Sequence, residues 1–258
     1  MDLELNGKVA VVTGASRGIG KGIAQGLLNE GCHLVICARG EEALNQTAAE
    51  LRENDREVTA LPMDVTVSTN IIQLKQVVEE KYGGIDILVN NVGGNKRGLF
   101  EDTTDQDWQR IIDINFLSHV NISRAFIPLM KQKKKGSIVF ISSIFGRESG
   151  GATLSLYNTT KSALISLSKI MATELAPDGI RVNSVAPGSI RFPGGSWDRR
   201  CKENPQAMAE FIQKELPIGR FGTVEEVANV VCFLASDRAS LVTGTCLNVD
   251  GGQSRSLI

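Results

Sequence analysis

Two short stretches of the sequence have residue types and spacings that could do chemistry. The first is the glycine-rich run from Thr13 to Gly20 (TGASRGIG). Glycines at G-x-x-x-G-x-G spacing permit a tight turn, and they let the backbone approach a pyrophosphate closely. Between a strand and a helix, such a turn leaves the N–H groups that open the helix facing the anion. The run therefore predicts a nucleotide site, the alternative being an ordinary turn.

The second stretch contains Tyr157 and Lys161, which are four residues apart at the start of an expected helix. Both side chains then project from one face of that helix. By itself the pair is common and usually means a surface contact. Here Ser142 and Ser143 close an expected strand just upstream, and Asn115 lies on the preceding expected helix. Together these groups could exchange protons with a substrate.

The end of the second expected strand bears on the choice of nucleotide. Folds that bind NAD usually place Asp or Glu about 20 residues after the glycine turn, on the ribose 2′-OH. Here Ala38 occupies that place, Arg39 follows it, and Arg17 lies in the glycine turn itself. Guanidinium groups would form charge-assisted bonds with a 2′-phosphate, which a carboxylate would repel. We therefore expect NADP(H), the alternative being that Arg39 is a solvated loop residue.

The elements that must position these groups alternate between short apolar runs and helical patterns. This βαβα rhythm predicts an α/β fold, a Rossmann-type doubly wound parallel sheet of about seven strands with helices on both faces. The expected strands are Lys8–Thr13, His33–Ala38, Val58–Met63, Ile85–Asn90, Ser137–Ser142, Ile180–Val185 and Cys246–Val249. The expected helices include Ile19 to near Gly31, Ile71–Tyr82, one from Trp108 that ends before the lysine run 131–135, and Tyr157–Ala176.

We expect a single dinucleotide-binding catalytic domain over residues 1–258. Thr223 and Glu226 have the T-x-x-E spacing of a capping box ahead of the last helix. Ser189–Gly222 breaks the rhythm and reads as irregular, which inside a compact domain is usually functional. We expect a substrate lid at about 189–216.

Composition narrows the classes of function. The formal net charge is -1, which gives no general reason to expect nucleic-acid binding. No apolar run is long enough to span a membrane, and the N-terminus lacks the pattern of a signal peptide, so a cytoplasmic location is expected. The five cysteines and two histidines show no metal-like spacing, and buried free thiols are expected. The lysine run 131–135 is interpreted as a solvated helix end rather than an anion site.

The full set of motifs resembles the short-chain dehydrogenase/reductase family, in particular the single-domain 3-oxoacyl-acyl-carrier-protein reductases. The resemblance covers nearly the whole chain, and the order of the motifs makes it specific. The matching stretches are Thr13–Gly20, Asp64-Val65, Asn90-Asn91-Val92-Gly93, Asn115, Ser143, Tyr157 with Lys161, Asn183, Pro187-Gly188 and Asp250-Gly251-Gly252.

The resemblance implies a role for each catalytic residue. Tyr157 would be the general acid in reduction, and Lys161 would bind the nicotinamide ribose and stabilise the phenolate. At about 4 Å and an effective dielectric near 20, that attraction is roughly 4 kcal/mol, or about 3 pK units on a phenol of pKa ≈ 10. Ser143 would polarise the substrate carbonyl, and Asn115 would hold a water that links Lys161 to solvent. The cofactor contacts implied are Gly14, Ser16, Arg17, Gly18, Ile19, Gly20, Arg39, Asp64, Val65, Asn91, Gly93, Tyr157, Lys161, Pro187, Gly188 and Ile190.

Three positions depart from the family pattern. Val92 stands where the family has Ala, and the segment from Ser143 to Tyr157 is one residue longer than in many relatives. Ser143 is chosen because Ser143–Gly146 matches the family's S-x-x-G, with Ser142 as the alternative. Arg191 and Phe192 stand where many relatives have Thr after Pro-Gly, so a hydroxyl contact to the cofactor is lost and a cation is gained.

The expected function is NADPH-dependent reduction of a ketone, with a 3-oxoacyl thioester as one candidate. An NADP-linked dehydrogenase of sugars, cyclic alcohols or steroids is the alternative, and a non-catalytic nucleotide-binding protein is the alternative from another class. Substrate walls are expected at 94–99, 147–156 and 189–216. The cations of the last segment could steer an acidic carrier protein or a carboxylate. The alternative is a solvated lid helix with apolar anchors at Trp197 and Phe211. The resemblance also implies a homotetramer that packs the helices near 107–133 and 157–176 and the C-terminal region.

Overall fold

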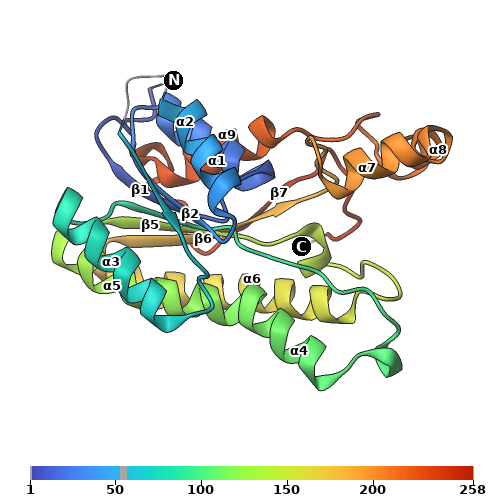
Figure 1. Ribbon diagram of the computed structural model, residues 1–258, viewed down its shortest axis with the longest axis horizontal. Helices are drawn as coiled ribbons and strands as arrows, with labels where there is room; N and C mark the ends of the chain where they lie inside the picture. Colours follow the sequence, from blue (N-terminus) through green and yellow to red (C-terminus); the bar gives the residue numbers. More distant parts are fainter. Residues whose placement is uncertain (1, 53–56, 258) are drawn as a thin grey trace.

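The computed structural model describes residues 2–52 and 57–257, and its centre is a seven-stranded parallel sheet with helices on both faces (Figure 1). The strand order is β3-β2-β1-β4-β5-β6-β7, which confirms the predicted doubly wound fold. The strands are β1 (Val9–Thr13), β2 (His33–Ala38), β3 (Val58–Pro62), β4 (Ile87–Asn90), β5 (Gly136–Ile141), β6 (Ile180–Pro187) and β7 (Cys246–Val249).

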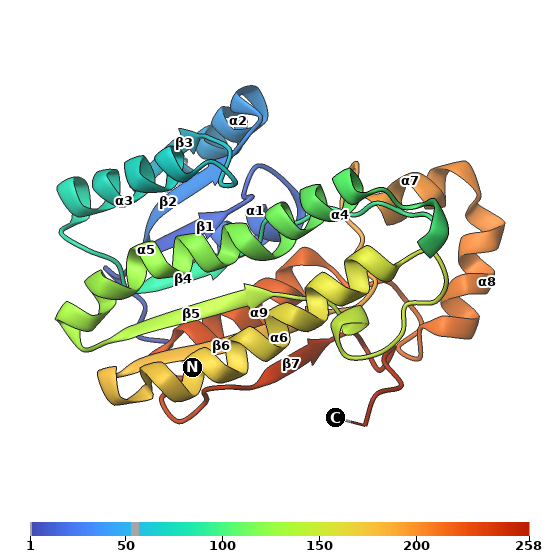
Figure 2. The ribbon, with the colours of Figure 1, turned by 90° about the horizontal axis from the view of Figure 1, so that it is seen from below.

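Helices α1, α2 and α9 cover one face of the sheet, and α3, α5 and α6 cover the other (Figures 1 and 2). The helices are α1 (Gly18–Asn29), α2 (Glu41–Arg52), α3 (Ser68–Tyr82), α4 (Asp105–Ile112), α5 (Ser118–Lys133), α6 (Ser155–Leu175), α7 (Ser196–Glu203), α8 (Pro205–Glu215) and α9 (Val224–Ala235). The capping box predicted at the start of α9 is present, with Thr223 and Glu226 bonded to each other's backbone.

The central strand β1 shows why these strands are continuous apolar runs. Ala10 and Val12 face the core beneath α1 and α9, whereas Val9 and Val11 face the core beneath α3 and α5. Successive side chains of a strand point to opposite faces, so a strand covered on both sides needs apolar residues at every position. Because β1 and β4 are parallel neighbours, their carboxyl ends lie side by side at one edge of the sheet.

The segment after β6 is largely helical, so the irregular structure predicted for Ser189–Gly222 is wrong. It contains α7 and α8, which project from the carboxyl edge of the sheet (Figure 1). The breaker residues delimit short helices: Asn204 caps α8 and Pro205 opens it, where a missing N–H costs nothing. Trp197 stacks on Phe211 with ring centroids 4.7 Å apart, which provides the expected apolar anchor between the two helices.

The lysine run lies partly inside a helix, because α5 continues to Lys133 and stops where Lys134 adopts a left-handed conformation, φ 49°. The prediction that the helix ends before the run is therefore wrong. Three of the lysines form ion pairs instead of being simply solvated. The pairs are Lys131–Asp178 (2.7 Å), Lys133–Asp86 (2.9 Å) and Lys135–Asp237 (2.7 Å).

The cysteines are free thiols, as expected, and Cys32, Cys37 and Cys232 are buried, whereas Cys201 and Cys246 are partly accessible. Over the residues with described positions, no cluster of three or more His, Cys, Asp or Glu side chains could hold a metal ion. Within the same residues, no helix is both long and apolar enough to cross a membrane.

Candidate active site

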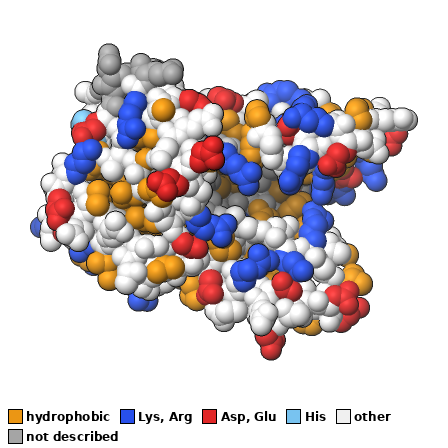
Figure 3. Space-filling model, in the orientation of Figure 1, with side chains coloured by type: hydrophobic (Ala, Val, Ile, Leu, Met, Phe, Trp, Pro, Cys, Tyr) orange, Lys and Arg blue, Asp and Glu red, His pale blue; other side chains and the backbone are white. Residues whose placement is uncertain are grey.

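A cavity of about 710 Å³ opens at the carboxyl edge of the sheet, where β1 and β4 are neighbours. The strand order reverses between these two strands, and open α/β sheets bind ligands at such a switch point. Figure 3 shows the molecule hollowed on this side, with Lys and Arg side chains around the hollow. Predicted site residues that line the cavity are Gly14, Ser16, Arg17, Ile19, Gly20, Arg39, Asp64, Val65, Asn91, Gly93, Tyr157 and Lys161.

The glycine turn leaves the N-terminus of α1 open to this cavity. Gly14 and Gly18 have φ of 65° and 58°, values that favour glycine. Helix α1 begins at Gly18 without a side-chain cap, and its first turn contains no acidic residue. The first N–H groups of a helix need partners, and the positive end of the helix dipole favours an anion. The turn therefore fits the pyrophosphate of a dinucleotide.

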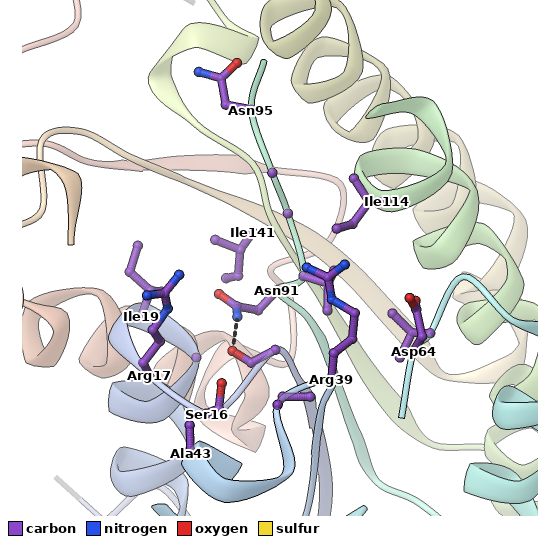
Figure 4. Close-up of a pocket in the computed structure, with 18 of the residues that line it drawn as sticks. Ser16, Arg17, Ile19, Arg39, Ala43, Asp64, Asn91, Asn95, Ile114 and Ile141 are labelled. Atoms are coloured by element: carbon purple, nitrogen blue, oxygen red, sulfur yellow. Dashed lines mark hydrogen bonds between the residues drawn. The ribbon is translucent and has the colours of Figure 1, made fainter. Parts of the chain in front are cut away.

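Asn91 and Thr13 fix the shape of that turn. The Asn91 Nδ2 amide donates to the backbone oxygens of Thr13 (3.0 Å) and Gly14 (3.1 Å). Figure 4 shows a dashed hydrogen bond from the Asn91 side chain to the glycine turn. The Thr13 hydroxyl in turn accepts from the backbone N–H of Asn91 at 3.0 Å. A Cβ at Gly20 would collide with both Asn91 and the Gly14 oxygen. These contacts couple the end of β1 to the end of β4.

Arg17 and Arg39 both reach toward the cavity and are exposed (Figure 4). Neither guanidinium has an ion pair or hydrogen bond to any residue in the described ranges 2–52 and 57–257. Asp64, across the cavity from Arg39, uses its Oδ1 to accept from the Thr66 N–H at 2.9 Å and the Thr66 hydroxyl at 2.8 Å. The two cations are thus available to an anionic ligand.

The two candidate serines have different partners. The Ser142 hydroxyl donates to the backbone oxygen of Lys161 at 2.8 Å and is thereby committed to holding β5 against α6. The Ser143 hydroxyl accepts from the Phe145 N–H at 3.2 Å. It also lies near the Tyr157 phenol, where it opposes the rise in the pKa of that phenol that burial causes. This geometry favours Ser143 over Ser142 as the partner of Tyr157, although only Ser142 is counted among the cavity-lining residues.

Burial controls the proton affinities of Tyr157 and Lys161. It raises the pKa of Tyr157 above its ordinary value, with the nearby Ser143 hydroxyl acting in the opposite direction. It lowers the pKa of Lys161 to about 8. The Lys161 ammonium donates to the Ile141 oxygen at 2.8 Å and lies 5.8 Å from the centre of the Tyr157 ring. Burial is thus the largest influence on the Tyr157 pKa, and the shift is upward instead of the lowering expected from Lys161.

Asn115 lies in a π-helical turn, 113–117, between α4 and α5, and such turns are frequent at functional sites. Its side chain is buried and clamps the loop after β4. Oδ1 accepts from the Gly94 N–H at 2.7 Å, while Nδ2 donates to the Gly94 oxygen at 2.9 Å and the Thr160 hydroxyl at 3.0 Å. Both amide hydrogens are therefore used by the protein, and the geometry shows Asn115 positioning the loop rather than offering a donor to water.

A buried histidine that the motifs did not single out supports the same loop. His119 Nε2 lies 2.7 Å from the Val92 oxygen, so that nitrogen is protonated and donates. The ring stacks on Phe140 with centroids 6.0 Å apart. Burial, with the nearby Lys161, lowers the pKa of His119 to about 3. His119 is therefore neutral and serves to position the loop after β4. The residue types alone gave no sign of this role, because a single histidine in a helix forms no motif.

Four predicted cofactor contacts lie outside the lining of the cavity. Pro187 ends β6 beside Val249, Gly188 is crowded by Asp250 and Gln253, and Ile190 packs in the core against Gly222. Gly18 is covered by the Phe192 ring, which a Cβ at Gly18 would meet at 2.7 Å. Phe192 and Ser196 line the cavity, together with Asn95. These three residues were not predicted as cofactor contacts, but they lie within the expected substrate walls 94–99 and 189–216.

Comparison with known proteins places the chain in a family. The family model described as enoyl-(acyl carrier protein) reductase matches residues 14–254. A 3-oxoacyl-(acyl-carrier-protein) reductase from Thermotoga maritima is 36% identical over 250 residues, which are 97% of this chain and 99% of the relative. The oxidoreductase UcpA of Escherichia coli strain K12 is 36% identical over 253 residues, 97% of this chain and 96% of the relative.

Solved structures agree with these sequence relatives. L-sorbose reductase from Gluconobacter frateurii, complexed with NADPH and L-sorbose, superposes with a TM-score of 0.94 at 34% identity, over 100% of both chains. A 7α-hydroxysteroid dehydrogenase complexed with NADH superposes with a TM-score of 0.90 at 31% identity, over 100% of this chain and 98% of that one. The chain therefore belongs to the short-chain dehydrogenase/reductase family and is an oxidoreductase, as the motifs predict.

Proposed function

We propose that the chain is an NADPH-dependent reductase that transfers hydride to a ketone, with Tyr157 as the general acid. One observation carries the proposal. Tyr157 and Lys161 line the same cavity as the uncapped glycine turn and the unpaired guanidinium groups of Arg17 and Arg39. A cofactor bound along this cavity would have its phosphates near the glycine turn. Its other end would lie near the proton-transfer groups of the protein, Tyr157 and Lys161. When bound, it supplies the hydride, and the protein supplies position and polarity.

The catalytic roles follow from the placement of the side chains. Ser143 lies near the Tyr157 phenol, so a substrate carbonyl oxygen bound between the two hydroxyl groups would be polarised by both. Tyr157 gives its proton to that oxygen. Lys161, buried on the same helix, would bind ribose hydroxyls of the cofactor, and its charge would stabilise the phenolate that is left after proton transfer. Asn115 holds the loop after β4 at Gly94.

The preference for NADPH rests on Arg17 and Arg39, because Ala38 and Arg39 stand at the end of β2 where NAD-binding folds have a carboxylate, and both guanidinium groups are free of partners in the described residues. L-sorbose reductase, which shares 34% identity, was solved with NADPH, whereas the 7α-hydroxysteroid dehydrogenase at 31% identity was solved with NADH. The relatives thus include both cofactors, and the arginines of this chain favour the phosphorylated one.

The substrate class is a ketone enclosed by the loop after β4, the loop after β5 and a lid formed by residues 189–216. A 3-oxoacyl thioester is supported by the relative from Thermotoga maritima. A sugar or steroid alcohol is the second candidate, and the likeness to L-sorbose reductase at a TM-score of 0.94 favours it. A non-catalytic nucleotide-binding role is disfavoured, because such a protein has no physical need for Tyr157, Ser143 and Lys161 together. We further propose a cytoplasmic homotetramer.

The test is NADPH and NADH oxidation against a panel of acyl thioesters, sugars and steroid ketones. NADPH-dependent turnover of at least one class supports the proposal, and preference for NADH contradicts the cofactor assignment. Tyr157→Phe removes the transferable proton and leaves the ring in place. We expect turnover to fall by roughly 10²–10⁴-fold while NADPH affinity, measured by fluorescence titration, stays within about twofold. Turnover retained by Tyr157→Phe would sink the mechanism.

A further inference from the structure

The loop after β5, residues 142–154, supplies Ser143 and is held at two consecutive positions by the C-terminal part of the fold. The Arg147 Nη1 donates to the Cys246 oxygen in β7 at 2.7 Å. The Glu148 carboxylate accepts, at Oε2, from the Ser254 hydroxyl at 3.0 Å and from the Arg255 N–H at 2.7 Å. In Figure 1 the C-terminal end lies beside the short helix that follows β5.

The backbone of Glu148 is tied to the catalytic helix. Its carbonyl oxygen accepts from Nδ2 of Asn158 at 2.7 Å, and Asn158 directly follows Tyr157 in α6. The end of the loop is also bonded to the first turn of α6, because the Asn158 N–H donates to the Leu154 oxygen at 2.8 Å. One residue thus bonds the start of α6 through its backbone and the 250–255 segment through its side chain.

The 250–255 segment contacts the other substrate-side segments as well. The Gln253 Oε1 accepts from the Ser189 N–H at 2.8 Å, directly after Pro187-Gly188. A Cβ at Gly251 would strike Ile218, which follows α8. Asp250 folds the segment on itself, because its Oδ1 accepts from the Gly252 N–H and its Oδ2 from the Ser254 N–H. The segment therefore touches the loops after β5 and β6 and the region after α8.

We propose that Glu148 is a positioning residue for the proposed reduction: its carboxylate ties residues 254 and 255 to the loop that carries Ser143, and so fixes that loop relative to Tyr157. This rests on the proposed function. Two hydrogen bonds to one carboxylate oxygen are charge-assisted and hold the loop more firmly than neutral bonds would. If the Ser143 hydroxyl is displaced from the substrate carbonyl, the reaction slows, whereas cofactor binding at the distant phosphate site is unchanged.

The test compares Glu148→Ala with Glu148→Gln, whose amide oxygen can still accept both bonds. With the best ketone of the panel, we expect kcat/KM to fall by about tenfold in Glu148→Ala and to recover to within about threefold in Glu148→Gln. NADPH affinity should stay within about twofold in both. Glu79→Ala is the control, because its partly exposed pair with Lys75 on α3 lies outside the cavity and is worth little. Unchanged kcat/KM in Glu148→Ala overturns the proposal, as does a matching loss of NADPH affinity.

A double variant separates positioning from general loss of structure. Ser254→Ala should reduce kcat/KM less than Glu148→Ala, and the double variant should match Glu148→Ala alone, whereas additive losses contradict the tie. Hydrogen exchange provides a readout that does not depend on turnover. Amides of residues 144–154 should exchange faster in Glu148→Ala and Ser254→Ala than in Glu79→Ala. If the unsubstituted chain turns over no ketone, the proposed function fails, while unchanged exchange independently refutes the tie.

Discussion

At the scale of single residues, Lys161 is a charged side chain that is almost entirely buried. Burial lowers its pKa to about 8, below the ordinary value of 10.5, so the folded state binds its proton less tightly than the unfolded state does. The resulting penalty on stability is fully present below pH 8 and disappears as the pH rises past 10.5. Its full size is on the order of 3 kcal/mol.

Lys161→Met should therefore stabilise the protein at pH 7 while abolishing turnover. The lost bond to the Ile141 oxygen offsets part of the gain, which leaves about 1–2 kcal/mol. Urea unfolding at pH 7 and at pH 10 measures this, and the advantage of the variant should shrink at the higher pH. A variant less stable than the parent at pH 7 would show that the buried cation is well compensated.

Arg39 is the residue on which cofactor choice depends most directly. Loss of one charge-assisted contact to a 2′-phosphate should raise the Kd for NADPH by about tenfold to hundredfold in Arg39→Ala. The Kd for NADH, measured in the same variant, serves as the control and should change by less than about twofold. Equal losses for both cofactors would place Arg39 away from the phosphate.

At the scale of elements, the phosphate turn depends on how closely α1 packs against α9. Gly22 faces Val224 at the start of α9, and a Cβ there would lie 2.7 Å from the Val224 Cβ. Likewise, a Cβ at Gly26 would lie 3.1 Å from the Cys232 Sγ and 3.2 Å from the Ala228 Cβ. The glycines of α1 beyond the turn thus serve helix packing, which holds the N-terminus of α1 at the cavity.

Gly22→Ala should destabilise the fold by about 1–3 kcal/mol through overpacking, and it should weaken NADPH binding because α1 is displaced. Thermal unfolding and a fluorescence titration measure the two effects. Gly98→Ala is the control, since its Cβ would meet only the Thr103 methyl at 3.6 Å. Equal melting temperatures for the two variants would mean that α9 moves aside without cost.

At the scale of the whole molecule, exposed apolar side chains on α6 fit the proposed tetramer. Ile170 is 56% exposed on the helix expected to pack against its copy. Ile170→Glu should dissociate the assembly, because a carboxylate at an apolar contact loses hydration without gaining a partner. Light scattering should give the mass of four chains for the parent and a smaller mass for the variant. Ile72→Glu, at 66% exposure on α3, is the matched control and should leave the mass unchanged.

The strands of the sheet could be predicted from the residue types alone, because strands covered on both faces must be apolar throughout. His33–Ala38 and Cys246–Val249 were predicted to the residue. The glycine turn was equally readable, since its conformation excludes most other residues. For the same local reason, the capping box of Thr223 and Glu226 followed from spacing alone. Local backbone requirements leave a direct trace in the residue types.

Which polar groups meet depends on the folded chain. That Ser142 bonds α6 while Ser143 lies near Tyr157 depends on how β5 ends against that helix. The choice between irregular and helical structure for residues 196–215 stayed open in the sequence, because tertiary packing of Trp197 and Phe211 stabilises these short helices. The desolvation of Lys161 and the tie between Glu148 and Ser254 join positions far apart in the chain. Such contacts leave no periodic pattern, because burial and long-range partners arise only when the chain is folded.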